Sequence, residues 1–226
     1  MAVGFLATVI VLGTTSGQES ETPQKKDEPS VEKIAEGVYQ IGAVVLDQNT
    51  NELSMKGEIN MQRGLIEYFA CTRFGKLHES TLVLDVEPYQ LQVALLLMGL
   101  EPGGNIEYQG DANTPQGDSL EVWVEWQENG KPERHRAEDL VYNIAEKRTM
   151  EQTPWIFTGS KIVNGTFMAD FEGCLIATFH DPFAILNNPL PSGADDTLYR
   201  VNESLVPEKG TPVNLILKAV NVRTED

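Results

Sequence analysis

His78, Glu79 and Ser80 follow one another just before an apolar segment and form the most promising chemical grouping in the sequence. An imidazole, a carboxylate and a hydroxyl can transfer protons or bind a ligand or a metal ion. Neighbouring residues on a strand face opposite ways, so we expect His78 and Ser80 to share a site while Glu79 points elsewhere, unless the backbone bulges. The triplet alone is no catalytic triad, since the sequence lacks a G-x-S-x-G nucleophile turn. A purely structural His78, bonded to a loop or helix, is the alternative.

A second grouping lies at the end of a predicted strand, where His180 and Asp181 follow the letters CLIATF. Functional side chains often occupy strand ends, but an Asp-Pro step is also ordinary turn chemistry. Together with His78 and Asp170, these residues offer imidazole and carboxylate ligands that suit a divalent metal. These residues lie far apart in the sequence, so their spacing does not indicate that they meet. The metal is unknown, and no cofactor is predicted.

The sequence contains two cysteines, Cys71 and Cys174. In an oxidising compartment such a pair is a candidate disulfide, whereas two buried free thiols would be ordinary in a cytosolic protein. The sequence leaves both alternatives open. No C-x-x-C pair and no Cys-His cluster occurs. A zinc or iron–sulfur site made within this chain is therefore not expected.

Acidic residues outnumber basic ones, with 34 Asp and Glu against 17 Lys and Arg and a formal net charge of −17. Phosphates would be repelled, which argues against nucleic acid as a partner. Residues 1–30 hold few of these charges, so the acidity belongs to the part that folds. It serves either solubility or the binding of cations or a basic partner. We expect a protein partner or a small ligand.

Residues 1–17 begin with an apolar run that reaches Leu12 and continue with small residues. This pattern is typical of a signal peptide and is too short to span a membrane, although a basic start is missing. We therefore expect an extracytoplasmic protein, periplasmic or secreted, with no integral membrane segment in the mature chain. Residues 18–35 are polar and predict a disordered tether, and residues 36–226 predict a single α+β domain.

The clearest of the elements that must position these residues is a helix that starts at Pro88 and ends near Gly99. Since its polar residues occur only in its first turn, we expect it to be buried on all sides. One or two further short helices are expected, at 137–145 and 181–186. The rest of the chain predicts short strands.

Hairpin signals dominate the rest of the sequence. Residues 119–127 alternate apolar and polar side chains, and the Asn129-Gly130 step then predicts a turn back. Frequent hairpins and few helices argue against a doubly wound parallel sheet. The patterns together predict an α+β fold, in which a mixed or mostly antiparallel sheet of many short strands packs with one buried central helix over about residues 88–99.

The stretch Gly75–Gly104, which reads GKLHESTLVLDVEPYQLQVALLLMGLEPGG, is similar to the signature of the YdjY-domain family of bacterial proteins. The resemblance runs from Gly57 to Lys218, and its further matching segments are 117–126, 137–141, 154–160, 169–170 and 187–218. It implies an exported protein, of a kind found in planctomycete-type bacteria, with no established activity. Some relatives carry a ferredoxin-like cysteine region that this chain lacks, so iron–sulfur electron transfer is not implied.

Two functional hypotheses follow from the sequence. The first is an exported acidic binding module without catalytic activity, since no nucleophile or metal motif is present. The second is a metal-assisted hydrolase centred on His78 with Asp170 or His180. The two differ in whether these side chains meet in one pocket.

Overall fold

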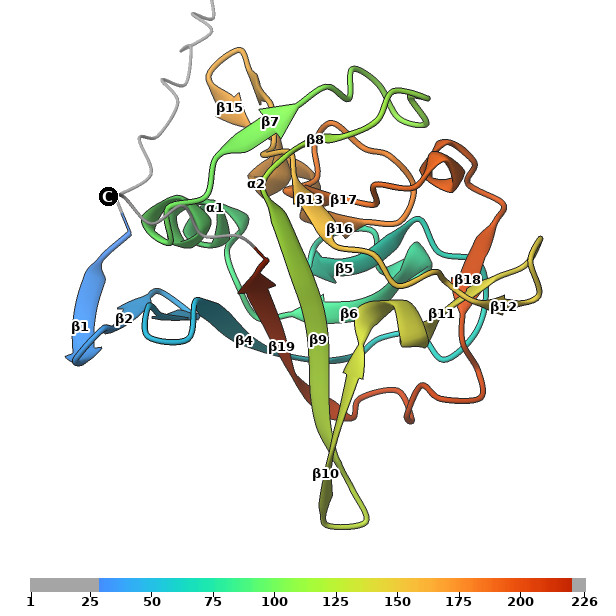
Figure 1. The fold of residues 1–226 in the computed structure, drawn as a ribbon, viewed down its shortest axis with the longest axis horizontal. Helices are drawn as coiled ribbons and strands as arrows, with labels where there is room; N and C mark the ends of the chain where they lie inside the picture. The colour runs from blue at the N-terminus through green and yellow to red at the C-terminus, as the bar shows by residue number, and fades with distance from the viewer. Residues whose placement is uncertain (1–28, 221–226) are drawn as a thin grey trace, which may run out of the picture.

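The computed structural model of the chain describes residues 29–220. The signal-peptide-like segment 1–17 and residues 18–28 of the expected tether lie outside the described residues. Strand β1 (Val31–Ala35) falls within the segment 18–35 and is exposed along its whole length. It pairs with β2 (Val38–Ile41), and the two form a hairpin at the side of the fold (Figure 1).

Eight strands close into a barrel, and the fold is mostly β, with 43% of residues 29–220 in strands and 14% helical. In barrel order, the strands are β4 (Glu52–Ile59), β19 (Pro212–Ala219), β9 (Ser119–Glu128), β13 (Trp155–Phe157), β17 (Leu186–Asn187), β16 (Cys174–Ala177), β5 (Tyr68–Thr72) and β6 (Ser80–Leu84). The ring closes because β6 pairs with β4. The pairs β5–β6 and β16–β17 are parallel, and the other pairs in the ring are antiparallel.

The expected sheet around a buried central helix is therefore wrong. The helix, α1 (Pro88–Leu97), lies beside the barrel strands and contacts β2 (Figure 1). One face of it is buried around Leu91 and Leu95, whereas Leu96 is 47% exposed and Leu97 is 45% exposed. An apolar sequence misled the prediction because apolar residues need not be buried, and more than half of a folded protein's surface is apolar.

The barrel interior is filled by alternate side chains of its strands. On β9, Leu120, Val122 and Val124 are buried in the core, and the residues between them are half-exposed, as the sequence alternation predicts. Closure depends on Gly57 of β4, because a Cβ atom there would overlap the carbonyl oxygen of Val83 on β6. A glycine is needed where the two backbones come this close.

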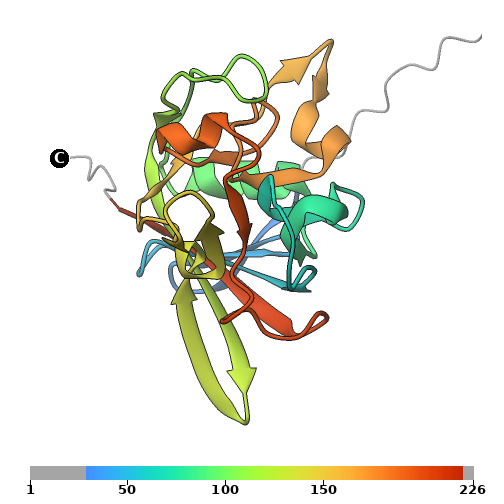
Figure 2. The ribbon, with the colours of Figure 1, turned by 90° about the vertical axis from the view of Figure 1, so that its right-hand side faces the viewer.

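Smaller elements surround the barrel, and the hairpin of β9 with β10 projects beyond it (Figures 1 and 2). They are β3 (Val44–Asp47), η1 (Leu77–Glu79), β7 (Pro102–Gly104), β8 (Gln116–Gly117), β10 (Lys131–Arg136), η2 (Ala137–Leu140), β11 (Val141–Asn143), β12 (Arg148–Thr149), β14 (Ile162–Val163), β15 (Thr166–Phe167), α2 (Met168–Glu172), η3 (Pro191–Ala194) and β18 (Tyr199–Val201).

The expected short helices are only partly present. A single 3-10 turn, η2, starts the segment 137–145 before the chain enters β11, and the segment 181–186 is a turn that leads into β17. The short α-helix that does form is α2, which follows the β14–β15 hairpin. Between residues 29 and 220, the fold contains no helix with the length and apolar character that a membrane crossing needs.

Candidate functional site

His78 and Glu79 lie on the wall of a pocket of about 420 Å³ at the start of β6. They are carried by η1, in the connection that joins the parallel strands β5 and β6. Because parallel neighbours start at the same end, residues 73–79 must run back along β5 before β6 can begin. The pocket is lined by Met61, Gly64, Leu65, Glu67, His78, Glu79, Asp196 and Thr197.

Ser80 does not share this site. It is the first residue of β6 and is completely buried. His78 is 78% exposed, and its Nε2 lies 3.5 Å from Oε2 of Glu79. The expectation that His78 and Ser80 face one way is wrong, because η1 is a 3-10 turn and strand alternation starts only at Ser80.

The pocket is electrostatically unbalanced. Glu67 and Asp196 have no ion-pair partner among residues 29–220, and Glu79 is paired only with its neighbour His78. Burial raises the pKa of the Glu67 carboxyl above its ordinary value, and the negative charges of Glu79 and Asp196 raise it further, while Lys76 partly offsets the effect. Three carboxylates from separate segments thus border one cavity with too little positive charge to balance them.

His180 serves the fold and not this pocket. It is 1% exposed, its Nδ1 lies 2.6 Å from the carbonyl oxygen of Asp111, and its Nε2 lies 2.8 Å from that of Asn188. Its ring packs so closely on Gly193 that a Cβ atom there would overlap it. Both ring nitrogens are therefore used to hold backbone loops together.

Asp181 lies at the base of a buried polar cluster. Its Oδ2 accepts a hydrogen bond of 2.6 Å from the Tyr68 hydroxyl, and its Oδ1 accepts one of 2.8 Å from the backbone of Phe183. The same hydroxyl accepts bonds from Lys76 Nζ at 2.9 Å and Gln109 Nε2 at 3.0 Å. Burial and then the charge of Asp181 raise the pKa of Tyr68, which keeps it a neutral donor.

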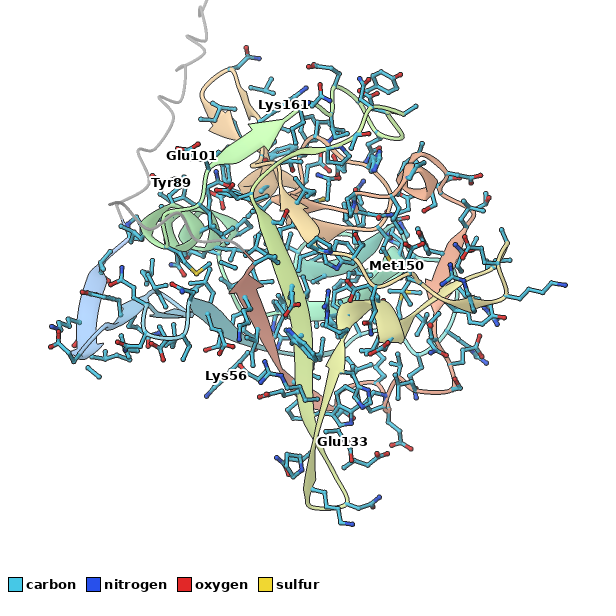
Figure 3. The ribbon with its side chains drawn as sticks, viewed as in Figure 1. Lys56, Tyr89, Glu101, Glu133, Met150 and Lys161 are labelled. Atoms are coloured by element: carbon cyan, nitrogen blue, oxygen red, sulfur yellow. The ribbon has the colours of Figure 1, made fainter. Side chains whose placement is uncertain are left out.

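Asp170 caps a helix. It lies in the first turn of α2, and its Oδ1 accepts a 3.0 Å hydrogen bond from the backbone N–H of Tyr89. Tyr89 lies at the start of α1 (Figure 3). Unbonded N–H groups at a helix start favour an acidic acceptor. Asp170 thus joins two helices. Within the described part of the chain, no three His, Cys, Asp or Glu side chains are grouped to hold a metal ion.

Cys71 and Cys174 are completely buried free thiols, so the structure contains no disulfide between them. They are paired residues of β5 and β16. Burial raises the pKa of Cys71 to about 11 and also raises the pKa of Cys174. Both are therefore protonated near neutral pH.

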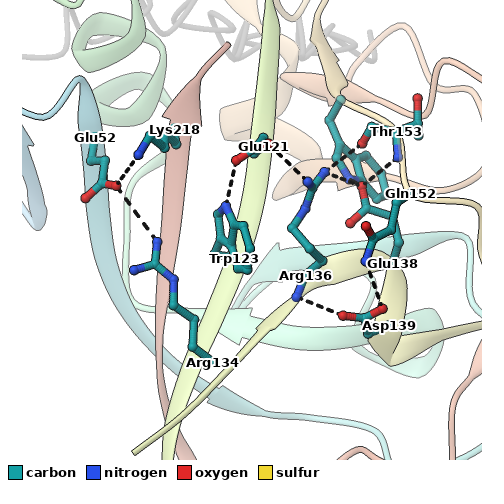
Figure 4. Close-up of polar contacts among 11 residues, drawn as sticks. Glu52, Glu121, Trp123, Arg134, Arg136, Glu138, Asp139, Gln152, Thr153 and Lys218 are labelled. Carbon is teal, nitrogen blue, oxygen red and sulfur yellow. Dashed lines mark hydrogen bonds and ion pairs between the residues drawn. The ribbon is translucent and has the colours of Figure 1, made fainter.

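A charged cluster that the sequence reasoning missed connects β9, η2 and β13 (Figure 4). Arg136 lies 3.2 Å from Oε1 of Glu121 and 2.9 Å from Oε1 of Glu138. The same oxygen of Glu138 accepts a 3.1 Å bond from the Trp155 indole, and the residue is completely buried. Burial raises the pKa of Glu138, and Arg136 opposes that change. Through these contacts the cluster links β9, η2 and β13 to one another.

A family model described as the YdjY domain matches residues 44–218, which contain the pocket and nearly all of the barrel. Neither a curated protein nor a solved structure matches the chain.

Proposed function

The chain belongs to the YdjY-domain family, and we propose that it is a binding module whose pocket at His78 and Glu79 receives a cationic group of its partner. The observation that supports this most is the surplus of carboxylates around that cavity. Glu67, Glu79 and Asp196 border it, and no ammonium or guanidinium group from residues 29–220 lines it. A cation from outside would supply the missing charge.

The shape of the pocket favours a lysine or arginine side chain of a partner protein. The cavity of about 420 Å³ lies within the range of small-ligand sites. Met61 and Leu65 line it beside the carboxylates, and apolar walls suit the methylene stem of such a side chain, whose charged end would reach Glu67. The net charge of −17 would attract a basic partner from a distance.

The hydrolase alternative has less support. It needs His78 to meet Asp170 or His180, but Asp170 caps α1 and both ring nitrogens of His180 contact backbone carbonyls. We retain the binding module as our proposal.

We also propose that the module acts outside the cytoplasm, as a periplasmic or secreted protein. The support is the sequence of residues 1–17, which has the apolar run and small residues of a signal peptide. The intact mass of the protein from its native host should then lack roughly 15 to 25 N-terminal residues. A full-length cytoplasmic species would contradict export.

The binding proposal is tested by titrating the full chain, at low salt, with a tetralysine peptide in which only the N-terminal amine is acetylated and the lysine amines are free. Removing the charge of one carboxylate that contacts a lysine should weaken binding roughly tenfold. Glu67→Gln and Glu79→Gln should both show this loss, and added salt should weaken wild-type binding. The same peptide with its lysine amines acetylated should not bind.

Glu128→Gln is the matched control, because Glu128 is an exposed carboxylate at the end of the β9–β10 hairpin, outside the pocket. It should bind the peptide like wild type. Equal affinity in all three variants would mean that the general negative charge attracts lysine, and it would contradict a defined site. Absence of any binding would contradict it as well.

A further inference from the structure

Cys71 and Cys174 lie directly opposite each other on β5 and β16. The backbone N–H of Thr72 donates a 2.9 Å hydrogen bond to the carbonyl oxygen of Gly173. A bond between these flanking residues marks the cysteines as a non-hydrogen-bonded pair, in which Cα atoms lie about 4.5 Å apart with both side chains on one face. This spacing is within the range of about 4.4 to 6.8 Å that disulfides need.

We propose that Cys71 and Cys174 are an oxidation site, at which a disulfide forms and links β5 to β16 inside the barrel wall. The register of the two strands pairs Cys71 with Cys174, and it shifts only beyond this pair, between Cys174 and Ile176. Each thiol now contacts a carbonyl oxygen, with Sγ of Cys71 3.8 Å from that of Leu82 and Sγ of Cys174 3.9 Å from that of Glu172. Rotation about the two Cα–Cβ bonds turns the sulfurs toward each other.

The reaction needs an oxidant, for which we name a low-molecular-weight disulfide such as oxidised glutathione. The thiolate of one cysteine attacks a sulfur of the oxidant, whose S–S bond breaks and releases one thiol. The second cysteine then attacks the mixed disulfide and releases the other thiol. Two S–H bonds of the protein are lost, one S–S bond forms, and the oxidant takes up both electrons and both protons.

The burial of the two thiols determines when the disulfide can form. Thiolate is the reacting form, and burial keeps both thiols protonated in the folded chain, so oxidation of the finished barrel should be slow. In the unfolded chain the cysteines are open to solvent and react readily. We therefore expect the bridge to form during folding, as β16 pairs with β5.

The test is oxidative refolding of the wild-type full chain. Reduced, denatured protein is refolded with oxidised glutathione and then denatured and treated with a thiol alkylating agent. The refolded chain should take up no alkyl group, should weigh two hydrogen atoms less than reduced protein, and should give a peptide in which Cys71 is joined to Cys174. The closed loop is long, so the bridge should stabilise the fold. The melting temperature of the oxidised protein should exceed that of the reduced protein by on the order of 10 °C.

Cys71→Ala and Cys174→Ala, treated in the same way, each leave one cysteine and should show neither the internal link nor the added thermal stability. Circular dichroism of reduced wild-type protein checks that the chain folds without the bridge. Two alkylated thiols, two glutathione adducts or links between chains in refolded wild-type protein would overturn the proposal. None of these outcomes depends on what the pocket at His78 binds, so failure here leaves the proposed function unaffected.

Discussion

Nδ1 of His180 lies 2.6 Å from the backbone carbonyl oxygen of Asp111, a residue 69 positions earlier in the chain. The opposite ring nitrogen contacts the carbonyl oxygen of Asn188. Carbonyl oxygens only accept hydrogen bonds, so a ring nitrogen that carries a proton donates to the oxygen that it faces. One buried side chain thereby fixes two loops that otherwise share little regular structure.

Replacing His180 should therefore cost stability. In His180→Gln, the shorter amide cannot reach both carbonyl oxygens, and a buried acceptor left unbonded costs about 1 to 3 kcal/mol. We expect the free energy of unfolding, measured in urea, to fall by about 2 to 4 kcal/mol. His78→Gln is the control, because His78 is 78% exposed, and it should stay within about 0.5 kcal/mol of wild type. Equal losses in the two variants would contradict the distinction between them.

Glu67 should make stability depend on pH. Its folded pKa is raised above the ordinary value of 4.5, so the unfolded chain releases the proton first as pH rises. Stability from this group is complete below about pH 4.5 and decreases as pH rises through the folded pKa. Glu67→Gln should therefore melt higher than wild type at neutral pH and equally near pH 4, whereas Glu128→Gln should show no such trend. A lower melting temperature of Glu67→Gln at neutral pH would contradict the raised pKa.

Gly57 should tolerate no side chain. In Gly57→Ala, the new methyl group overlaps the carbonyl oxygen of Val83, so β4 and β6 must separate where the barrel closes. We expect a loss of about 1 to 3 kcal/mol in thermal or urea unfolding. Ser54→Ala, a half-buried position on the same strand, should change stability by less than about 0.5 kcal/mol. Wild-type stability of Gly57→Ala would mean that the closure is looser than described.

Arg136 should be needed for stability because it balances the charge of the buried Glu138 carboxylate. In Arg136→Leu, the buried carboxylate loses its cation, and breaking a buried pair in this way costs about 3 to 5 kcal/mol. Adding Glu138→Gln should recover part of that loss, since the neutral amide needs no counter-charge. Urea unfolding of the two single variants and the double variant measures the coupling. Additive losses would show that the two side chains act independently.

Local features of the fold could be predicted from the sequence. The alternation over residues 119–127 and the Asn129-Gly130 turn predicted the β9–β10 hairpin, because both signals lie within a short stretch of chain. Closure of the barrel could not be predicted in this way. It depends on the pairing of β4 with β6. The need for a glycine at position 57 is evident only in the fold, where the carbonyl oxygen of Val83 lies beside it.

The site was predictable to a similar extent. His78 and Glu79 were identified as candidates and do line a pocket, but Glu67 and Asp196 come from other segments, and no spacing in the sequence connects them. The role of His180 was hidden for another reason. Its partners are backbone carbonyl groups, which every residue carries, so side-chain identities give no sign of them.

The position of β19 between β4 and β9 has a consequence for biosynthesis. β19 is the last barrel strand along the chain, yet its two neighbours are made much earlier. While a ribosome is still making the residues between β9 and β19, one edge of β4 and one edge of β9 lack their partner strand. The unpaired N–H and C=O groups at these edges can pair with other chains. Closure of the ring must wait until residues 212–219 have emerged, so a nascent chain stalled before that point would be a natural client for a chaperone.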